Sequence, residues 1–566
     1  MKQLIYLFVL AFCYANSFAG VQLRNGNFFI TYLDSKTTLN GATLELARTY
    51  NSKSNYVGWF GYGWGTEYEV RLEPSADGSV FVFENGSGAV NKFYAKSIDP
   101  AALKKVIDLV VASVKAKKPI NKATEDQLVA RLSKDPEYLQ DVSVRYKIKN
   151  DIKVGTVLTS IDFPGQNVEV TGDGYVRNLP TGIKQFFNKE GRITKSRNTA
   201  GYGLDFTYNK AWQVTKLVDT TGNQLIFEWL STGRIKSVST HDKKKASYDY
   251  KGDDLVKSVD TENRAYSFTY DSNHNLVKLT DLSIKDNTKN SLLVKYDPKT
   301  FDTLEVINRD GSSNEYIYKV EKKKDSTLTS TIVLRKEGGT TIGEKYEYFY
   351  KIKANGAEWL ARYLEITNAN YDVAKKQLVG GNKEETFYEE NKSFPVKKVE
   401  GDKEISYGYT SDSLLQKRVT KFKGKLIESM EYAYHPVYKK VTEAKSVDIN
   451  TKYEYNNKAE LVKAFDNKGN AILFVYDING RITKMFEKSA QTKASRTLAF
   501  TYNVKGKPTV VELEGVGKLD IKYDSQTQTK VEDVKSSKGL EVYNQVRSVV
   551  SSFMDVIRPT GISLSI

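Results

Sequence analysis

The sequence predicts a mainly β protein in which antiparallel β-hairpins repeat along one spiralling sheet. Two observations carry this prediction. The 566-residue chain holds 37 tyrosines and only 4 methionines. This composition is typical of strands, because a tyrosine ring packs on a sheet while its hydroxyl stays in water. Aromatic residues also recur at a nearly constant spacing, which indicates an array of similar units along the chain.

The recurring aromatic residues, here called anchors, form two blocks. Seven of the twelve steps between neighbouring anchors equal 21 residues, although aromatic residues make up only 12% of the chain. The first block is Phe187, Tyr208, Trp229, Tyr250, Tyr270, Tyr296 and Tyr318, and the second is Tyr388, Tyr409, Tyr434, Tyr455, Tyr476, Tyr502 and Tyr523. A spacing this regular is not random, and it defines the repeat unit.

Each unit contains two turns and two strands. The segment from Asp477 to Gly480 follows the anchor Tyr476 and has the composition of a tight turn. In such turns an aspartate bonds its own backbone and a glycine takes a positive φ. A second turn, such as Asp466 to Gly469, comes about eleven residues after an anchor. The alternating segments between turns are expected to be strands, so each unit is one hairpin, and the anchors are expected to form a cross-strand ladder.

This pattern resembles the YD (Tyr-Asp) repeats of the Rhs and teneurin families. The stretch from Tyr476 to Ile482 is an almost complete copy of their signature. Three further motifs are similar to the segment that precedes the repeats in Rhs proteins, at residues 49–52, 61–65 and 173–182. The resemblance covers residues 25–96 and 155–530. It implies a large antiparallel sheet that closes into a hollow shell.

The first nineteen residues are expected to be a signal peptide. Lys2 supplies the positive start, Leu4 to Tyr14 the apolar run, and Ser17 to Ala19 the small residues before a cleavage site at Gly20. The alternative is a buried first strand. Cys13, the only cysteine, would leave with the signal. We therefore expect an exported protein, located in the periplasm, at the cell surface or outside the cell, with no transmembrane segment and no disulfide.

The resemblance and the interruptions of the repeat divide the chain into six segments. They are a signal peptide (1–19), an Rhs-type N-terminal β region (20–96), a helical insertion (97–150), the completion of the N-terminal β region (151–186), the YD-repeat shell (187–536, degenerate over 319–387), and a C-terminal helix with its tail (537–566).

The helical insertion is predicted from capping signals. Asp99 before Pro100 is a helix start, residues 124–127 form a capping box, and Asp135 before Pro136 starts a further short helix. We expect this insertion to plug the shell or to dock a partner.

The C-terminal helix is predicted from apolar residues that step by three and four, namely Tyr543, Val546, Val550, Phe553 and Ile557. Ser536 or Ser537 is expected to cap it. Two placements are open: packing on the outside wall of the shell, or insertion into its open end.

The search for chemistry gives no site. The histidines His241, His274 and His435 have no partner at metal-ligand spacing and are interpreted as surface or turn residues. The aspartate-rich turns lack the alternating ligands of a calcium loop. The glycine-rich stretch 61–65 lacks the lysine and the helix of a phosphate loop, and is interpreted as a tight bend with packed aromatics. The sequence thus predicts no catalytic, cofactor-binding or metal-binding residue.

The charge of the chain is strongly basic, with a net value of +16. The basic clusters at residues 243–245, 322–324 and 421–425 are scattered, whereas nucleic-acid binding calls for a continuous stripe. No specific nucleic-acid partner is predicted. Attraction to anionic surfaces stays open.

The end of the chain departs from the pattern of toxin-carrying Rhs proteins. Their shell ends in an Asp-Pro-x-Gly-Leu element, whose aspartate is linked to self-cleavage and release of a C-terminal toxin. The nearest match here runs from Arg558 to Ile562, with arginine in the place of the aspartate. The resemblance therefore implies an uncleaved chain without a toxin domain.

Three functional hypotheses follow. The first is a non-enzymatic bacterial shell that binds or scaffolds at the cell envelope, with exposed tyrosine ladders that stack on a glycan or contact a cell-surface protein. The alternative is a carrier or encapsulating component of an Rhs-type toxin system, whose effector is separately encoded. The second alternative is a glycan-active enzyme, which requires two convergent carboxylates in a cleft.

Overall fold

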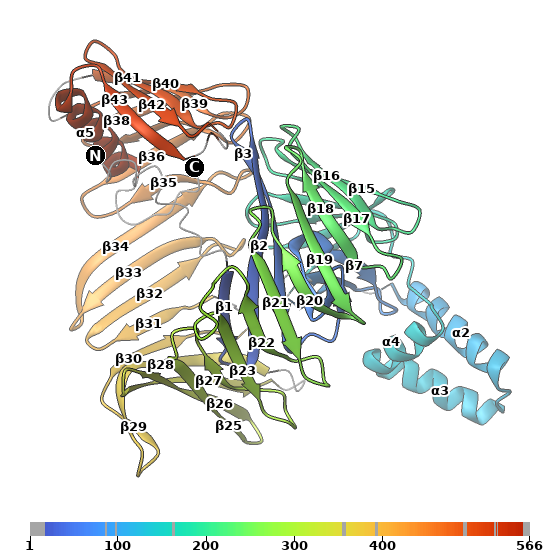
Figure 1. The fold of residues 1–566 in the computed structure, drawn as a ribbon. Coiled ribbons are helices and arrows are strands. Elements are labelled where there is room, and N and C mark those ends of the chain that lie inside the picture. Colours follow the sequence, from blue (N-terminus) through green and yellow to red (C-terminus); the bar gives the residue numbers. More distant parts are fainter. Residues whose placement is uncertain are drawn as a thin grey trace.

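The computed structural model describes residues 17–84, 88–96, 99–160, 165–353, 358–390, 394–490, 495–525, 528 and 530–557. Its main element is one long antiparallel sheet in which the strands from β7 to β43 pair in chain order, with a branch where β28 pairs with both β29 and β30. Figure 1 shows this sheet curving round the N-terminal strands, with β15 to β18 at the upper right and β38 to β43 at the upper left. The predicted fold class, a mainly β chain of antiparallel hairpins, is confirmed.

The first strands of the large sheet are β7 (Arg71–Pro74), β8 (Val80–Glu84), β9 (Ala89–Ala95), β10 (Val157–Thr159), β11 (Asn167–Thr171), β12 (Gly174–Asn178), β13 (Lys184–Asn188), β14 (Ile193–Arg197), β15 (Gly203–Tyr208), β16 (Val214–Asp219), β17 (Gln224–Trp229), β18 (Ile235–Thr240), β19 (Lys245–Lys251), β20 (Asp254–Val259), β21 (Ala265–Tyr270), β22 (Leu276–Asp281), β23 (Ser291–Tyr296) and β24 (Thr303–Ile307).

They are followed by β25 (Ser313–Lys322), β26 (Ser326–Glu337), β27 (Thr340–Ile352), β28 (Glu358–Asp372), β29 (Gln377–Val379), β30 (Asn382–Phe387), β31 (Lys397–Glu400), β32 (Lys403–Tyr409), β33 (Leu415–Phe422), β34 (Lys425–Tyr434), β35 (Val441–Lys445), β36 (Asn450–Tyr455), β37 (Leu461–Asp466), β38 (Ala471–Tyr476), β39 (Ile482–Lys488), β40 (Ser495–Tyr502), β41 (Pro508–Leu513), β42 (Gly517–Tyr523) and β43 (Val531–Ser536).

The anchors are fixed by hydrogen bonds that reach back to the preceding repeat. Tyr476 Oη donates to the Leu461 carbonyl at 2.7 Å, and Trp229 Nε1 donates to the Val214 carbonyl at 2.7 Å. Twelve of the fourteen anchors make this bond, the others being Tyr208, Tyr250, Tyr270, Tyr296, Tyr318, Tyr409, Tyr434, Tyr455, Tyr502 and Tyr523. Successive repeats are therefore linked by a side-chain hydrogen bond where we expected a ladder of rings.

A β-bulge explains why the bond is needed. At eleven of these twelve anchors, all but Tyr318, the register shifts by one residue, so that Trp229 pairs with Ile235. For all of these anchors but Tyr409, the accepting carbonyl belongs to the residue that is paired with the previous anchor. Val214 faces Tyr208, and it lies beyond the last residue pair of the β16–β17 ladder. The anchor side chain thus satisfies a carbonyl group that backbone pairing leaves over.

The turn after the anchor Tyr476 has the predicted chemistry. Asp477 Oδ1 accepts hydrogen bonds from the backbone N–H groups of Asn479 and Arg481, both at 2.9 Å. Gly480 has a φ of 75°, in the left-handed region that favours glycine. The stretch from Tyr476 to Ile482 therefore specifies a turn and its capping bond.

All anchors lie on one face of the sheet, here called the anchor face. Residues i and i+2 of a strand, and directly paired residues of neighbouring strands, point to the same side. Steps of two residues along a strand and steps across paired residues connect Tyr248, Tyr346, Tyr407 and Tyr432. All four side chains therefore lie on the same face as the anchors. Two elements pack against it: the N-terminal strands over the first half and the C-terminal helix over the second. Figure 1 shows the N-terminal strands inside the curve of the sheet.

The N-terminal strands form a small sheet of β1 (Ser17–Gln22), β2 (Asn27–Leu39), β3 (Ala42–Asn51) and β6 (Trp64–Gly65), beside a two-stranded pair of β4 (Val57–Gly58) and β5 (Gly61–Tyr62) and a 3₁₀ turn at Glu67–Glu69. Most of the predicted signal peptide, residues 1–16, lies outside the described residues. Ser17 to Ala19 begin β1, which pairs with β2. Signal cleavage before Gly20 stays a prediction.

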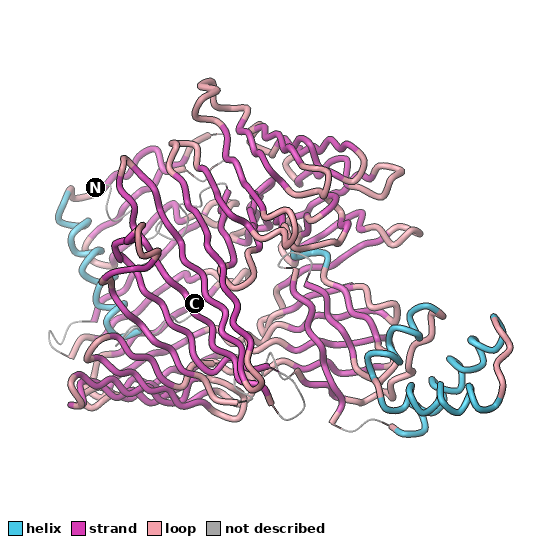
Figure 2. The backbone as a smooth tube through the Cα atoms, turned by 90° about the horizontal axis from the view of Figure 1, so that it is seen from below, coloured by secondary structure: helices cyan, strands magenta, loops and turns pink. Residues whose placement is uncertain are grey.

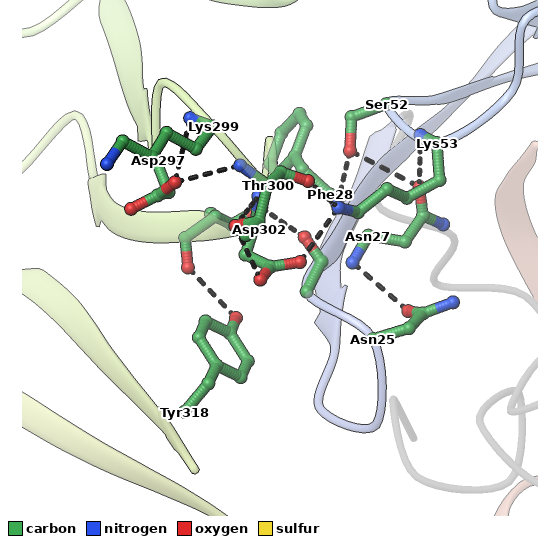
Figure 3. A network of polar contacts seen from close by, with 12 residues as sticks. Asn25, Asn27, Phe28, Ser52, Lys53, Asp297, Lys299, Thr300, Asp302 and Tyr318 are labelled. Carbon is green, nitrogen blue, oxygen red and sulfur yellow. Dashed lines mark hydrogen bonds and ion pairs between the residues drawn. The ribbon is translucent and has the colours of Figure 1, made fainter. Parts of the chain in front are cut away.

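The long hairpin of β2 and β3, here called the N-terminal hairpin, is held at both ends. At one end Lys53 Nζ bonds the Thr300 carbonyl at 2.6 Å and Asp302 Oδ1 at 2.7 Å, in the turn between β23 and β24 (Figure 3). At the other end the Asn40 N–H donates to the Val504 carbonyl at 2.7 Å, in the turn between β40 and β41. The hairpin thus crosses the concave side and joins distant parts of the sheet.

The helical insertion is confirmed as three helices, α2 (Pro100–Lys117), α3 (Lys122–Lys134) and α4 (Pro136–Arg145). Asp99 and Asp135 cap α2 and α4 as predicted. The predicted capping box at 124–127 is wrong, because Asn121 caps α3 by accepting from the Thr124 N–H. The helices enclose their own apolar cluster and project away from the sheet (Figure 2), so the expected plug of the shell is wrong.

The C-terminal helix is confirmed as α5 (Leu540–Ile557). Val542, Val546 and Val549 are buried against β37, β38 and β41 to β43 on the anchor face, which excludes the outside wall. The predicted serine cap is wrong: Ser536 ends β43, and the Ser537 hydroxyl accepts from the Lys518 N–H. The side chains of Phe553 and Ile557, and all of Arg558 to Ile566, lie outside the described part. Within that part, no helix is long and apolar enough to cross a membrane.

The anchor bond can be tested by Tyr476→Phe. This change removes the hydroxyl donor and leaves the Leu461 carbonyl without it, so we expect the free energy of unfolding to fall by about 1 kcal/mol. Urea denaturation measures the loss. Tyr94→Phe is the control, because Tyr94 is 44% exposed. An unchanged stability of Tyr476→Phe would contradict the capping role.

The contact between the N-terminal hairpin and the β40–β41 turn can be tested by Gly506→Ala. A Cβ atom at Gly506 would lie 2.0 Å from the Gly41 Cα, whereas one at Gly515 would meet nothing within 4 Å. The two glycines have similar φ values of 72° and 76°, so Gly515→Ala carries the same backbone cost. We expect only Gly506→Ala to speed hydrogen exchange of the Asn40 amide. Equal exchange in both variants would contradict the clamp.

Candidate functional site

The most deeply buried charges lie where the N-terminal hairpin packs on the sheet. Asp34 is the extra residue of a bulge in β2, which turns its side chain toward Arg48 of β3. Arg48 Nε donates to Asp34 Oδ2 at 2.5 Å, and Tyr248 Oη donates to the same oxygen at 2.9 Å. The Arg48 and Asp34 side chains are 0% and 1% exposed. This network fixes the hairpin on β19 and β20 and is closed to solvent.

Aromatic rings enclose the Arg48 guanidinium. Its carbon lies 4.4 Å from the ring centre of Trp64, 4.9 Å from that of Tyr32 and 5.2 Å from that of Phe268. Such cation–π contacts compensate part of the cost of burying the charge. The bend at residues 61–65 delivers Trp64 to this place, so its interpretation as a tight bend with packed aromatics is confirmed. The Arg48–Asp34 pair was not predicted, because no sequence pattern marks it.

The three histidines lie in separate turns. His241 Nδ1 lies 2.8 Å from Thr37 Oγ1, and His274 Nδ1 lies 2.8 Å from Asp254 Oδ1. His435 Nδ1 accepts from its own turn backbone. These contacts match the predicted turn roles. Over the described ranges, no group of three or more His, Cys, Asp or Glu side chains is placed to hold a metal ion.

Carboxylates do converge in one surface groove, formed by β33 to β35. Glu431 and Glu443 line it, together with Lys417. The Lys417 ammonium, 2.7 Å away, lowers the pKa of Glu431 by hydrogen bonding and charge, and Asn450 Nδ2 donates to Glu443 at 2.7 Å. A glycosidase acid needs a raised pKa so that it stays protonated. Glu431 is shifted in the opposite direction, so this groove does not support the enzyme hypothesis.

A second groove has the lining of a binding site. It is an open groove of about 500 Å³ on β27, β28 and β30, and its walls are mostly apolar. The lining residues, here called the aromatic groove, are Phe349, Lys351, Trp359, Ala361, Arg362, Phe387 and Tyr388. Phe349 follows Tyr348, which packs on the anchor face, so Phe349 and the paired Arg362 and Phe387 lie on the opposite, outer face. Tyr388, which follows Phe387, is an anchor and only borders the groove. A volume of this size suits a small-molecule or sugar ligand.

Cross-strand pairing arranges the groove in two rows. Phe349 pairs with Arg362, which pairs in turn with Phe387, and Lys351 pairs with Trp359 beside them. The Arg362 guanidinium lies 6.0 Å from the Phe349 ring centre, and Lys351 Nζ lies 5.9 Å from that of Trp359. The groove therefore combines aromatic surfaces with hydrogen-bond donors at their edges.

Two glutamates orient the arginine of the groove. Arg362 lies 3.2 Å from Glu385 and 3.5 Å from Glu347. The carboxylates lie on the two strands that flank β28, so the guanidinium is held between them. A sugar ring has an apolar face and hydroxyl groups at its edge. Aromatic rings can stack on that face, and planar polar groups beside them can bond the hydroxyls.

The anchors themselves are not such a surface. Their rings are half-buried on the anchor face, and most of their hydroxyls are occupied by the bonds to the preceding repeat. Burial also raises the pKa of Tyr455, Tyr502 and Tyr523 to about 12 in each case. The expectation that exposed tyrosine ladders bind ligands is therefore wrong. The groove residues lie in or beside the segment that the sequence marked as degenerate (319–387), and Trp359 is its one tryptophan.

Comparisons with known proteins add the following. A sequence profile described as a domain of unknown function (DUF6531) matches residues 19–93. No curated protein matches the sequence. The fold was also compared with solved structures. A complex of TcdB2, TccC3 and Cdc42 is 9% identical with a TM-score of 0.29, over 92% of this chain and 34% of that one.

Two further solved structures are similar. The Tc holotoxin pore of Photorhabdus luminescens is 11% identical with a TM-score of 0.22, over 92% of this chain and 36% of that one. A porin-like protein from Bacteroides uniformis is 10% identical with a TM-score of 0.15, over 35% of this chain and 93% of that one. The chain thus spans about a third of the toxin chains it matches. Because these identities and TM-scores are low, the fold is assigned from the strand pairing described above.

The carboxyl group of Glu69 generates a pH prediction. Glu69 is buried beside the N-terminal sheet, and Oε2 accepts from the Trp59 N–H at 3.2 Å. Burial raises its pKa to about 8. Below the unfolded pKa of about 4.3 the carboxyl is protonated in both states, and its contribution to stability is fully present. As the pH rises toward 8 only the unfolded state loses the proton, so stability falls by up to about 1.4 kcal/mol per pH unit.

The Glu69→Gln variant should remove this dependence, because the amide does not titrate. We expect urea denaturation to show the wild type losing stability relative to Glu69→Gln between pH 5 and pH 8. The exposed Glu190 provides the control, and Glu190→Gln should follow the wild type. A parallel pH profile of Glu69→Gln and the wild type would contradict a protonated Glu69.

Proposed function

We propose that this protein is an exported, non-enzymatic β-shell that acts as a binding scaffold at the cell envelope, with the aromatic groove as its ligand site and a glycan as its ligand. The observation that carries the proposal is the groove itself. Trp359, Phe349 and Phe387 supply ring surfaces, and Arg362 with its two glutamates supplies fixed polar groups. Export is supported by the signal-like residues 1–19.

The groove favours a neutral or weakly acidic sugar over an extended peptide. Phe349, Arg362 and Phe387 are each paired with a neighbouring strand on both sides, so no free strand edge is present among them for a peptide to extend. The cation Lys351 beside Trp359 adds a site for a carboxylate or sulfate group on the sugar. A protein ligand at the same groove is the other outcome that the tests below distinguish.

A second candidate function is encapsulation of a separately encoded effector. One stretch of the anchor face, on β30 to β33, belongs neither to the apolar cluster beneath the N-terminal hairpin nor to that beneath α5. Its side chains include paired charges, Lys398 with Glu384 and Arg418 with Glu428, at 2.8 and 2.6 Å. A polar concave wall is compatible with an enclosed polypeptide. Co-purification of a second chain with the natively expressed protein would favour this candidate.

The glycan proposal is tested with Trp359→Ala on a glycan array and then by titration with the sugars that bind. Removal of the indole should weaken binding about tenfold, which corresponds to about 1.4 kcal/mol of stacking and burial. Trp212→Ala is the matched control, since Trp212 is 45% exposed in a turn away from the groove. Thermal unfolding of both variants checks that the fold is intact.

Two outcomes would overturn the proposal. One is the absence of any glycan bound by the intact protein, and the other is equal binding by Trp359→Ala and the wild type. If a cell-surface protein is captured instead and Trp359→Ala releases it, the groove is a protein site. The export part is checked separately by sequencing the N-terminus of the mature protein, which should begin at Gly20.

A further inference from the structure

The hairpin of β33 and β34 ends in a tip of unusual composition. Residues 421–427 read Lys-Phe-Lys-Gly-Lys-Leu-Ile, and all seven are exposed. Phe422, Leu426 and Ile427 expose 48%, 56% and 65% of their surface. Most turns of the repeat are built from aspartate, asparagine and glycine, so three large apolar side chains at one turn are an exception that the fold does not require.

The tip is an ordered β-hairpin. Lys423 and Gly424 form its two-residue turn with φ values of 48° and 77°, and Phe422 pairs with Lys425. The Lys423 N–H donates to the Asp402 carbonyl at 2.9 Å, which ties the tip to the neighbouring turn of β31 and β32. The step from Tyr409 to Tyr434 is 25 residues instead of 21, and the additional residues lie in this hairpin.

Positive charge dominates the tip. It holds three lysines and no acidic residue. Lys423 lies 3.7 Å from Asp402, but for Lys421 and Lys425 no carboxylate of the described chain lies within ion-pair distance. The nearest acidic side chains on the paired strands are engaged by other cations: Glu404 by Lys397 at 2.5 Å, and Glu428 by Arg418 at 2.6 Å.

We propose that this hairpin tip docks the protein on an anionic phospholipid bilayer. Phe422, Leu426 and Ile427 enter the boundary between headgroups and acyl chains, while the lysines contact the lipid phosphates. Apolar side chains surrounded by lysines are the complement of such a surface, because binding strength combines buried apolar area with attraction to anionic lipid. This goes beyond the proposed function, since it needs neither the aromatic groove nor a glycan.

The test is co-sedimentation of the full-length protein with vesicles. Phosphatidylcholine vesicles containing a quarter phosphatidylglycerol should sediment the protein, and pure phosphatidylcholine vesicles should not. Lys421→Gln with Lys425→Gln should lower partitioning about fivefold for each lysine removed. Replacing Phe422, Leu426 and Ile427 by serine should also abolish sedimentation, while circular dichroism and thermal unfolding stay unchanged.

A matched control separates the tip from general charge attraction. Lys322→Gln with Lys324→Gln removes two lysines from the basic turn between β25 and β26, and should leave partitioning nearly unchanged. Equal loss in both lysine pairs would show that only net charge matters and would overturn the proposal. Equal binding to both kinds of vesicle would also overturn it. So would concentration-dependent self-association that the serine variant abolishes, because the tip would then be a contact between copies of this chain.

Discussion

The hydrogen bond from each anchor to the preceding repeat is the interaction on which the sheet depends. A bulge at all but one of these hydrogen-bonded anchors bends the sheet and leaves one carbonyl group beyond the reach of the next strand. A buried carbonyl without a donor costs free energy comparable to a lost hydrogen bond. The Tyr hydroxyl or Trp N–H supplies the donor, as in Tyr476 to Leu461. The anchor residue thus lies at the bulge that bends the sheet, and its side chain donates the hydrogen bond that a carbonyl group would otherwise lack.

The N-terminal hairpin and α5 cover the anchor face. A sheet this long exposes apolar side chains on its concave side unless other elements pack there. The N-terminal hairpin covers the first half and α5 the second. The hairpin also carries Arg48 and Asp34, whose burial is tolerated only because each charge faces the other and aromatic rings surround the guanidinium. This pair fixes one register of the hairpin, so that the same strands can reach both Asp302 and Val504.

Local patterns predicted the repeated hairpins and the helices, because turn residues, anchors and caps act over short distances along the chain. Two caps were predicted wrongly for different reasons. At α3 a nearer competitor wins, because Asn121 accepts from the Thr124 N–H, whereas at α5 another strand decides, because Ser537 bonds Lys518 in place of capping the helix. The aromatic groove was not predicted, because Phe349, Trp359 and Phe387 become neighbours only through the register of β27, β28 and β30. The tyrosine anchors, which were predicted to bind a ligand, instead pack on the sheet and bond the preceding repeat.

The anchor bond also determines where the chain tolerates change in length. In units of regular length the donor lies 15 residues after its acceptor, as for Tyr476. In the longer units the separation grows to 19 or 20 residues, as for Tyr434 and Tyr502, yet the bond persists. The additional residues lie between acceptor and donor, in longer strands for β33 and β34 and in a longer turn between β22 and β23. The rim at the anchors varies little, with five residues from Tyr250 to its paired Leu255 and seven from Tyr296 to its paired Thr303. The other rim accepts longer inserts, so foreign peptides grafted into the far turns should be displayed without loss of the sheet.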